Sequence, residues 1–515
     1  MTTTAPHRSG DSFHDGGMVI IGGGLGGLAA AIELAYKDIP VTIVEANPYL
    51  GGMAAAIEAD GYTFDTVPTT ITMPHVLKGI IERTGRDASD YLDLVELDPQ
   101  SRCFFDDGAR IDLHRDPHQF AREIDTQFPN TKPGQNFLDF YQFSQRAHEL
   151  NEQHAFGPGT NIKHLLALRL YSTAGATIRK MIPEPHIGRV CECFLHATGS
   201  DHSIAPATLC HLAAAQLDHG CWYPMGGTHM VARALGRIAD ELGVQRVMGR
   251  RVTRILAEGG RATAVKLDDG REIMAAGVVS NCDVRRTYGE LLKGTDGAAL
   301  EHRRIAANFQ PSCSAFVLHL GLRTQYDQLA HHNFVLSRDS REEYDDIYRT
   351  GIPARDPTLH ITAPSRTDAS QAPDGCESLS ILVHTPALSD EHRWLQRGGK
   401  PGSTLTNYRQ IVIEKLKRLG MEDIESHIAV ERYLTPPQIE HTYNATGGAI
   451  YGHASHGRLK GLTKPGNRSK VLPNLYLAGS SVHPGAGVPK VLLSGIAAAR
   501  FACEDAGVGN AVDGT

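Results

Sequence analysis

The chain has 515 residues, of which 41% are hydrophobic and 21% are charged, a composition typical of globular proteins with roughly two to four domains. Its formal net charge of -7 argues against a nucleic-acid partner, because such proteins normally present a basic face. The nine cysteines are odd in number and scattered, which favours a reducing cytoplasm over a disulfide framework. Histidines are frequent, but the sequence contains neither HExxH nor paired CxxC motifs, so we predict no metal site.

The N-terminal stretch "MTTTAPHRSGDSFHDGG" is small and polar, without the apolar core of a signal peptide. We expect a disordered arm over residues 1–17 and a loose tail over residues 506–515. Outside the glycine-rich segment that follows the arm, the sequence has no run of about eighteen uncharged apolar residues. It therefore predicts no transmembrane span.

A β-branched run, Val19 to Ile21, predicts a buried strand that leads into a glycine-rich turn and an alanine-rich helical pattern. Gly22, Gly24 and Gly27 fit the motif GxGxxG. In this motif the glycines permit a tight turn, close approach to a pyrophosphate and close packing of helix on strand, while the N-terminus of the helix favours negative charge. The order predicts dinucleotide binding, and the alternative is a purely structural turn.

The next predicted strand, Val41 to Val44, ends at an acidic residue. Glu45 lies about twenty residues beyond the glycines, where a carboxylate can accept hydrogen bonds from an adenosine ribose. FAD and NAD share the ADP half, so this unit does not distinguish them.

A second strand, turn and helix stand near the C-terminus, with the strand predicted over Leu475 to Ala478. Gly485 and Gly487 allow the backbone to approach a flat ring closely. The helix expected from about Val488 would place its positive dipole end beside that ring. Reduced flavin carries negative charge there, so the unit favours FAD.

Several motifs make the resemblance specific: "HPGAGVP" after "NLYLAG", "GYTFDTVPTTITMP", "WYPMGG", "VVSNCD", "SCSAFVLHLGL", "LAHHNF" and "GGAIYG". Together they resemble the bacterial phytoene desaturase family of FAD-dependent carotenoid oxidoreductases, over nearly the whole chain after Gly17. The resemblance implies bound FAD and an acyclic carotenoid substrate.

The fold class that we expect is α/β, with a doubly wound, Rossmann-like FAD-binding domain. By resemblance, this domain is assembled from residues 18–95, 218–295 and 455–505. The hairpin signals Gly259-Gly260 and Asp269-Gly270 lie in its middle piece. An inserted α+β substrate-binding domain is expected from residues 96–217 and 296–454.

The motifs and the resemblance together predict the FAD contacts. They are Gly22, Gly24, Gly27, Glu45, Gly52, Val252, Gly479, Gly485, Gly487 and Val488. Three residues depart from the family pattern: Met53 replaces an arginine that could neutralise pyrophosphate, Val67 replaces a glycine, and Lys490 replaces a glycine. A lysine in the first turn of a helix opposes the helix dipole, which suggests a functional position.

Residues 153–183 contain no aspartate or glutamate. The segment combines leucines with the cations Lys163, Arg169, Arg179 and Lys180, as in a helix that lies on an anionic membrane surface. The alternative is a helix that packs on the core with its cations in solvent. Because the expected substrate is an insoluble polyene, we predict a helical membrane-facing segment in a cytoplasmic, peripherally membrane-associated protein.

The reaction predicted from the resemblance is desaturation of phytoene or a related acyclic carotenoid. Flavin accepts a hydride from an allylic carbon, a proton leaves the neighbouring carbon, and oxygen or a quinone then takes the electrons. The predicted catalytic residues are His483 and Lys490. His331 or His332 is a weaker candidate, since neighbours on a strand point to opposite faces and at most one can line a groove. Trp222 and Tyr223 are candidates for the channel wall.

Three alternatives remain open from the sequence. They are a carotene cis-trans isomerase that uses reduced flavin, a desaturase of hydroxylated or C30 carotenoids, and a non-enzymatic prenyl-binding escort related to the Rab GDP-dissociation inhibitors. The intact Glu45 and HPGAG loop are flavin features and argue against the escort.

Overall fold

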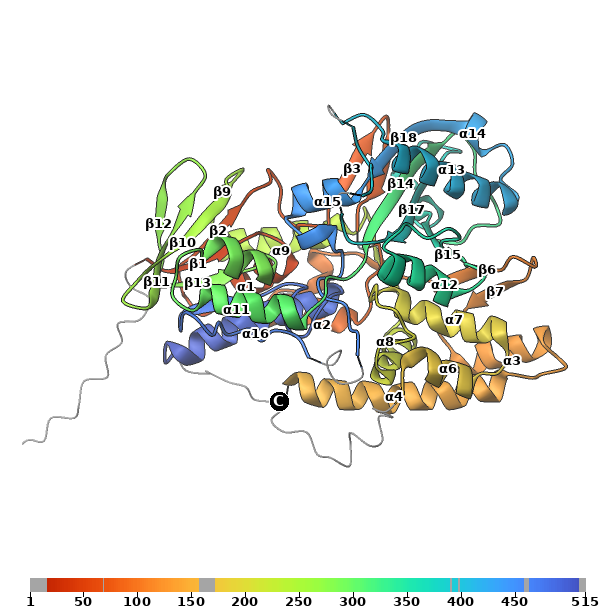
Figure 1. The fold of residues 1–515 in the computed structure, drawn as a ribbon, viewed down its shortest axis with the longest axis horizontal. Coiled ribbons are helices and arrows are strands. Elements are labelled where there is room, and N and C mark those ends of the chain that lie inside the picture. The colour runs from red at the N-terminus through yellow and green to blue at the C-terminus, as the bar shows by residue number, and fades with distance from the viewer. Residues whose placement is uncertain are drawn as a thin grey trace, which may run out of the picture.

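In the computed structural model, the described residues are 16–67, 69–156, 172–389, 391–396, 399–457 and 463–508, with only the backbone described over 151–156. Figure 1 shows a parallel sheet on one side of the molecule, a larger mixed sheet on the other, and a group of helices below the mixed sheet.

The parallel sheet has five strands in the order β19-β13-β1-β2-β9. Its strands are β1 (Met18–Ile21), β2 (Val41–Glu45), β9 (Gln245–Met248), β13 (Gly277–Ser280) and β19 (Leu475–Leu477). Met18 pairs with both Val41 and Gly277, so β1 is central. Three distant parts of the sequence therefore build one sheet, as expected for a Rossmann-like fold.

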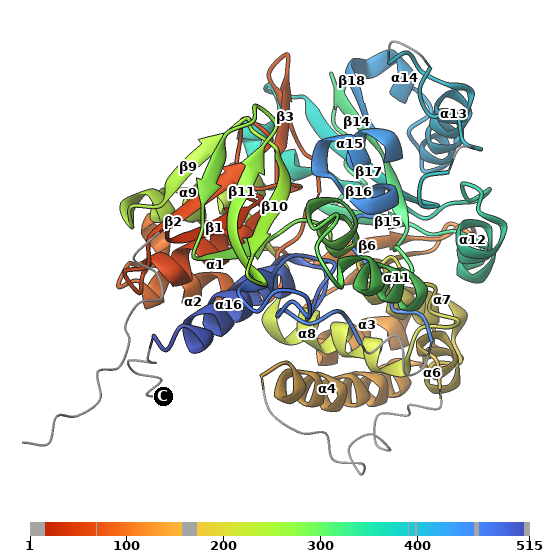
Figure 2. The ribbon, with the colours of Figure 1, turned by 60° about the vertical axis from the view of Figure 1, so that its left-hand side comes forward.

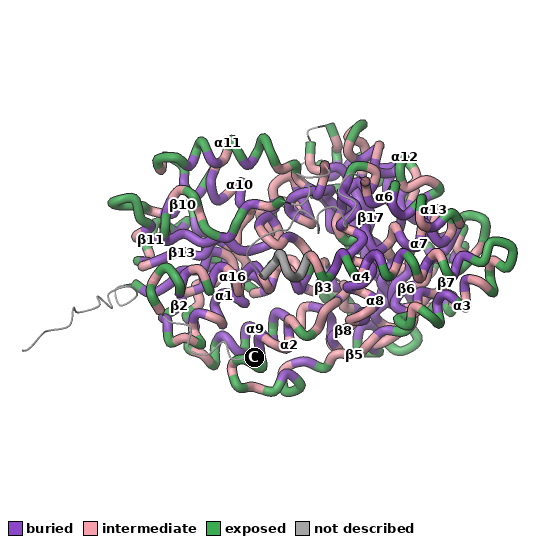
Figure 3. Tube along the Cα trace, turned by 90° about the horizontal axis from the view of Figure 1, so that it is seen from below, coloured by how far each residue is buried: buried purple, intermediate pink, exposed green. Residues whose placement is uncertain are grey.

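Helices cover one face of this sheet. They are α1 (Leu25–Ala35), α2 (Pro74–Arg83), α9 (His229–Glu241) and α16 (Val488–Asp505). Ile20 and Ile43 point toward these helices and are fully buried, in keeping with the alternation of side chains along a strand. The central strands and α1 are coloured as buried along most of their length in Figure 3.

The other face is covered differently from a doubly wound sheet. Val19, Ile21 and Val278 pack against a three-stranded antiparallel sheet (Figure 2), with α11 (Ala298–Asn308) beside it. The strands of that sheet are β10 (Val252–Glu258), β11 (Arg261–Leu267) and β12 (Glu272–Met274). Its two turns lie at Gly259-Gly260 and Asp269-Gly270, which confirms both hairpin signals.

Helices α1 and α16 approach each other very closely. A Cβ atom on Gly495 would lie 2.1 Å from the carbonyl oxygen of Gly26, so only glycine allows this contact. The first residues of the two helices, Leu25 and Val488, line one and the same cavity, described below.

The mixed sheet has seven strands in the order β18-β14-β17-β16-β15-β6-β7. They are β6 (Ser101–Phe104), β7 (Arg110–Leu113), β14 (Ser314–Leu322), β15 (His332–Val335), β16 (Leu359–Thr362), β17 (Glu377–Thr385) and β18 (Ile428–Leu434). All residues of β14 and β17 are buried. On one face, α13 (Ser403–Arg418) covers them through Val412 and Leu416.

A helical group packs below the mixed sheet around an aromatic core that includes Phe120, Phe137 and Phe140 (Figure 1). Its helices are α3 (Pro117–Gln127), α4 (Gly134–Phe156), α6 (Ala174–Met181), α7 (Pro185–His196) and α8 (His211–His219). Within the described ranges, no helix combines the length and apolar character needed to cross a membrane.

The remaining elements are short. They are β3 (Ala56–Ala59), β4 (Tyr62–Asp65), β5 (Leu94–Glu96), β8 (Trp222–Pro224), α10 (Val284–Arg286), α12 (Ser340–Asp345), α14 (Ile424–His427) and α15 (Pro436–Tyr443). The α/β class and the parallel Rossmann-like sheet are confirmed, and the structure shows that the second sheet is mixed. The exact domain boundaries stay a prediction.

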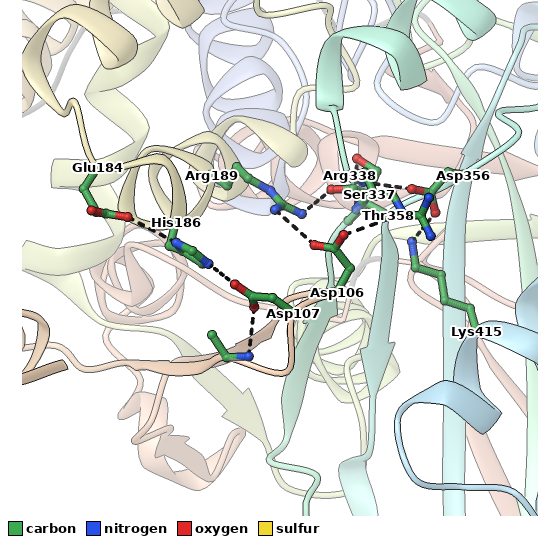
Figure 4. Close-up of polar contacts among 11 residues, drawn as sticks. Asp106, Asp107, Glu184, His186, Arg189, Ser337, Arg338, Asp356, Thr358 and Lys415 are labelled. Atoms are coloured by element: carbon green, nitrogen blue, oxygen red, sulfur yellow. Dashed lines mark hydrogen bonds and ion pairs between the residues drawn. The ribbon is translucent and has the colours of Figure 1, made fainter. Parts of the chain in front are cut away.

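Polar contacts tie α7 to the mixed sheet (Figure 4). His186 lies 2.8 Å from a carboxylate oxygen of Asp107 in the turn between β6 and β7. Arg189 lies 3.8 Å from Asp106 in the same turn and donates to the carbonyl oxygen of Ser337. These contacts fix the position of α7, which bears residues of the cavity described below.

Further along α7, Glu192 forms a buried pair with His202. The Nε2 atom of His202 lies 3.3 Å from Glu192, and the hydroxyl of Ser340 donates to the other carboxylate oxygen at 2.6 Å. Burial alone lowers the pKa of His202, but Glu192 raises it overall. Burial likewise raises the pKa of Glu192, but the hydrogen bond and charge of His202 lower it overall.

We expect this pair to stabilise the fold most between about pH 4.5 and 6.5, the ordinary pKa values of the two groups. The contribution of His202 is lost as pH rises through its raised pKa, and that of Glu192 is lost as pH falls through its lowered pKa. Glu192→Gln should lower the free energy of unfolding by about 1–3 kcal/mol near pH 5.5, and by less near pH 8.5. Urea unfolding measures this, with the exposed Glu272→Gln as control. An equal loss at both pH values would contradict it.

Candidate active site

A first cavity of about 1430 Å³ opens at the carboxyl ends of β1, β2 and β13. This is the edge at which open α/β sheets bind their ligands. Eight of the ten predicted FAD contacts line it, namely Gly22, Gly24, Glu45, Gly52, Val252, Gly479, Gly487 and Val488. Gly485 lines the neighbouring cavity instead, and Gly27 lines neither.

The glycines of the first turn have separate structural roles. Gly22 has a φ of +94°, a conformation that favours glycine. A Cβ atom on Gly27 would lie 2.1 Å from the carbonyl oxygen of Gly22, so Gly27 permits α1 to pack on β1. Gly24 precedes α1 at an ordinary φ of -69° and lines the cavity, so there a side chain would take cavity space.

Glu45 is buried at the end of β2, and its carboxylate is fixed by the backbone. One oxygen accepts from the amide of Gly23 at 2.7 Å and the other from the amide of Asn47 at 2.8 Å. A carboxylate offers about four lone-pair sites. Acceptor capacity is therefore left at the cavity wall, which fits the hydroxyls of a ribose.

Three polar residues of this cavity were missed in the sequence. Arg250 and Arg251 line it just before β10, so cations remain at the site although Met53 stands in place of an arginine. Asn281, which follows β13, donates from Nδ2 to the carbonyl oxygen of Gly22 at 3.3 Å, while its buried Oδ1 has no hydrogen-bond partner among the described residues. An unsatisfied buried polar atom fits a bound ligand. The motif "VVSNCD", which carries part of the family resemblance, contains Asn281 and could have indicated this residue from the sequence.

A second cavity of about 1980 Å³ lies between the mixed sheet, helices α7 and α8, and the loop that precedes α16. The mixed sheet contributes Val317, Phe334 and Leu382 to its wall. The two cavities share Val67, Tyr451, Ala486, Gly487 and Val488. The loop from His483 to Lys490 therefore forms part of the boundary at which the cavities meet.

Within this loop, Gly485 and Gly487 have φ values of +113° and +104°. Lys490 lines the second cavity, whereas His483 lines neither. The backbone of His483 is held by Asn467, whose Nδ2 donates to its carbonyl oxygen at 2.9 Å, and by Pro465, whose carbonyl oxygen accepts from its amide at 2.8 Å. The catalytic roles of His483 and Lys490 stay predictions.

Of the adjacent histidines, only His332 lines the second cavity, where its Nε2 lies 2.9 Å from the hydroxyl of Thr70. His331 packs its ring against Tyr223, with centroids 4.6 Å apart. Burial lowers the pKa of both histidines, to about 3 for His331. Both are therefore neutral near pH 7. Trp222 and Tyr223 line neither cavity and belong to β8.

Sequence reasoning also missed His453 and Lys464, which line the second cavity. Nδ1 of His453 lies 3.0 Å from the carbonyl oxygen of Ser481. Because a carbonyl oxygen can only accept, Nδ1 carries a hydrogen and donates this hydrogen bond. This leaves Nε2 as the basic nitrogen, and it is buried without a hydrogen-bond partner among the described residues. Burial lowers the pKa of His453 to about 4. In the part of the chain that the structure describes, no group of three or more acidic, histidine or cysteine residues could hold a metal ion.

Comparisons with known proteins identify the family of the chain. Residues 25–502 match the family model of flavin-containing amine oxidoreductases. A 4,4'-diapolycopene oxygenase from a Methylomonas species is 36% identical over 93% of this chain and 96% of its own length. A 4,4'-diaponeurosporene oxygenase from Staphylococcus haemolyticus is 33% identical over 93% and 95%, respectively. Both confirm the resemblance to carotenoid oxidoreductases.

Solved structures share the fold at low identity. An oxidoreductase from Methanosarcina mazei has a TM-score of 0.62 and 16% identity, covering 93% of this chain and 98% of its own. Cyclohexylamine oxidase from Brevibacterium oxydans has a TM-score of 0.58 and 15% identity, covering 96% and 99%. With the family model matched from Leu25 to Ala502, the chain is an FAD-dependent oxidoreductase that belongs to the flavin-containing amine oxidoreductase family.

Proposed function

We propose that this protein oxidises an acyclic C30 carotenoid with bound FAD. The observation that carries the proposal is the meeting of two cavities at Gly487, one lined by the glycine-rich turns and Glu45 and the other large and mostly apolar. The two relatives named above are oxygenases of 4,4'-diapolycopene and 4,4'-diaponeurosporene. They favour the C30 alternative over phytoene, the substrate expected first from the sequence.

Bound FAD would supply a two-electron acceptor that takes a hydride from the substrate. The residues of the chain orient the polyene along the second cavity and keep water away from it. Positive charge that develops on the substrate spreads over its conjugated double bonds, so a weak base suffices. Nε2 of His453 is neutral and basic, and we assign it the role of accepting the proton. We expect oxygen or a quinone to receive the electrons finally.

Product analysis tests the substrate and the reaction together. The FAD-loaded protein is supplied in separate reactions with 4,4'-diaponeurosporene and with phytoene, each with and without an electron acceptor. We expect the C30 carotenoid to be oxidised faster than phytoene, and to be oxidised beyond one turnover per bound FAD only when the acceptor is present. Faster oxidation of phytoene would overturn the assignment of a C30 carotenoid as the substrate. A product of unchanged mass would indicate an isomerase, and binding without reaction would indicate an escort.

We further propose that the protein associates peripherally with anionic membranes in the cytoplasm. Part of the 153–183 segment that suggested this, residues 157–171 with Lys163 and Arg169, lies outside the described residues. Arg179 and Lys180 stand exposed in the last turn of α6, although Arg179 also lies 3.9 Å from Glu192. Helix α6 packs on α7, and α7 contributes residues to the wall of the second cavity. The exposed cations on α6 therefore support delivery of the substrate from a lipid surface.

Reversing charge at Lys163 and Lys180 to glutamate should therefore weaken binding to anionic liposomes. Each cation near such a surface contributes about 1 kcal/mol, so we expect roughly tenfold or greater loss. Liposome flotation measures this, and raising the salt concentration should weaken the wild type similarly. Lys266→Glu on the exposed side of β11 is the matched control. Equal flotation of all three proteins would contradict the proposal.

A further inference from the structure

The second cavity has an unusual charge. Two lysines, Lys464 and Lys490, line it, and no aspartate or glutamate does among the described residues. The wall is otherwise made of apolar side chains, hydroxyls, amides and histidines whose pKa values are lowered by burial where they are shifted. The cavity thus holds positive charge without a counter-ion from its own wall.

Lys490 is unpaired. Its ammonium makes no hydrogen bond or ion pair with any described residue, and burial lowers its pKa to about 8. It stands in the first turn of α16, which begins at Val488, where the positive end of the helix dipole disfavours a cation. Burial and the helix dipole therefore both destabilise the charged form of Lys490.

Lys464 lies beside the same loop. Its Cε atom is 3.8 Å from the position that a Cβ atom on Gly485 would take, and its Nζ donates to the carbonyl oxygen of His453. Burial and, to a smaller extent, the charge of Lys490 lower its pKa to about 7. The two ammonium groups are therefore near enough to repel each other. A bound anion would relieve this repulsion and would pair Lys490.

We propose that Lys464 and Lys490 bind the carboxylate end of a carotenoid acid, with the polyene chain lying in the apolar remainder of the cavity. The inference rests on the proposed function and names a substrate class for the same site. Hydrogen bonds between ammonium and carboxylate groups are assisted by charge and are strong where water is excluded. Because both lysines adjoin the loop from Gly485 to Val488, the carboxylate end lies next to the place of oxidation.

Equilibrium binding tests the inference independently of turnover. The probes are a C30 polyene monocarboxylic acid, its methyl ester and the parent hydrocarbon, each titrated into the FAD-loaded protein and followed by polyene absorbance. The ester keeps the carbonyl group but lacks the charge. We expect the acid to bind the wild type about tenfold or more tightly than the ester, the effect of one charge-assisted hydrogen bond.

Variants then assign the preference to the two lysines. Lys490→Met and Lys464→Met should each reduce the ratio of ester to acid dissociation constants, and the double variant should bring it near one. Lys490→Arg keeps the charge and should retain the preference. Lys266→Met is the control and should leave the ratio unchanged. Because the readout is a ratio, a general loss of affinity cancels.

An acid that binds the wild type no better than the ester would overturn the inference, as would a preference that survives in the double variant. These outcomes differ from failure of the proposed function, which would appear as a C30 hydrocarbon that binds but is not oxidised.

Discussion

Replacing Gly24 with leucine should reduce FAD affinity at least about 100-fold, which corresponds to about 2.7 kcal/mol. A Cβ atom there would lie 2.9 Å from Nδ2 of Asn281, and Gly24 lines the first cavity. The larger side chain therefore occupies the space that the pyrophosphate needs beside the N-terminus of α1. Titration with FAD, followed by flavin absorbance and fluorescence, measures the change.

Gly79→Leu in α2 is the matched control, because a Cβ atom on Gly79 meets no atom within 4 Å. It should bind FAD as the wild type does. Gly24 has an ordinary negative φ, so the thermal unfolding of its FAD-free variant should remain cooperative. Wild-type FAD affinity in Gly24→Leu would show that the first cavity is not the pyrophosphate site.

Gly487→Leu should lower turnover of the carotenoid at least about 100-fold, equal to about 2.7 kcal/mol in the barrier. Gly487 lines both cavities and has a φ of +104°, which strains any other residue. Its side chain would enter the space where ring and polyene must meet. FAD should remain bound through Gly22 and Glu45, so steady-state rates are measured at saturating FAD.

Gly507→Leu controls for strain alone. Gly507 also has a positive φ, of +69°, with no atom within 4 Å of an added Cβ atom, and it follows the far end of α16. This variant should turn over the carotenoid at the wild-type rate.

The variants His483→Ala and His453→Ala compare the two candidate catalytic histidines. We expect His453→Ala to lower turnover more than His483→Ala does. Normal turnover in both Gly487→Leu and His483→Ala would place the reaction elsewhere.

The sequence predicted the local elements of the FAD-binding sheet well. The strand over Val19 to Ile21, the glycine turn and the strand ending at Glu45 are all present. They depend on short-range signals: β-branched runs, glycines that allow a turn, and an acidic residue at a set spacing. The antiparallel sheet on the second face follows from its turn residues, but its packing on β1 depends on distant residues and was not predicted.

The second cavity could be predicted much less. Lys464 and His453 come from a segment without a helix or strand signal, and only the fold brings them beside Gly485 and Ser481. Lys490 was noticed because it opposes a helix dipole, but its position in the second cavity, away from the first, required the structure. The proximity of the two lysines results from tertiary packing, which local sequence patterns do not predict.

C30 carotenoid oxidation by bound flavin is tested by anaerobic mixing of the FAD-loaded protein with 4,4'-diaponeurosporene while flavin absorbance is followed. We expect the absorbance of oxidised flavin to disappear as the carotenoid loses two electrons, and admission of an electron acceptor to restore it. Flavin that stays oxidised with the C30 carotenoid, but is reduced by phytoene under the same conditions, would contradict this expectation.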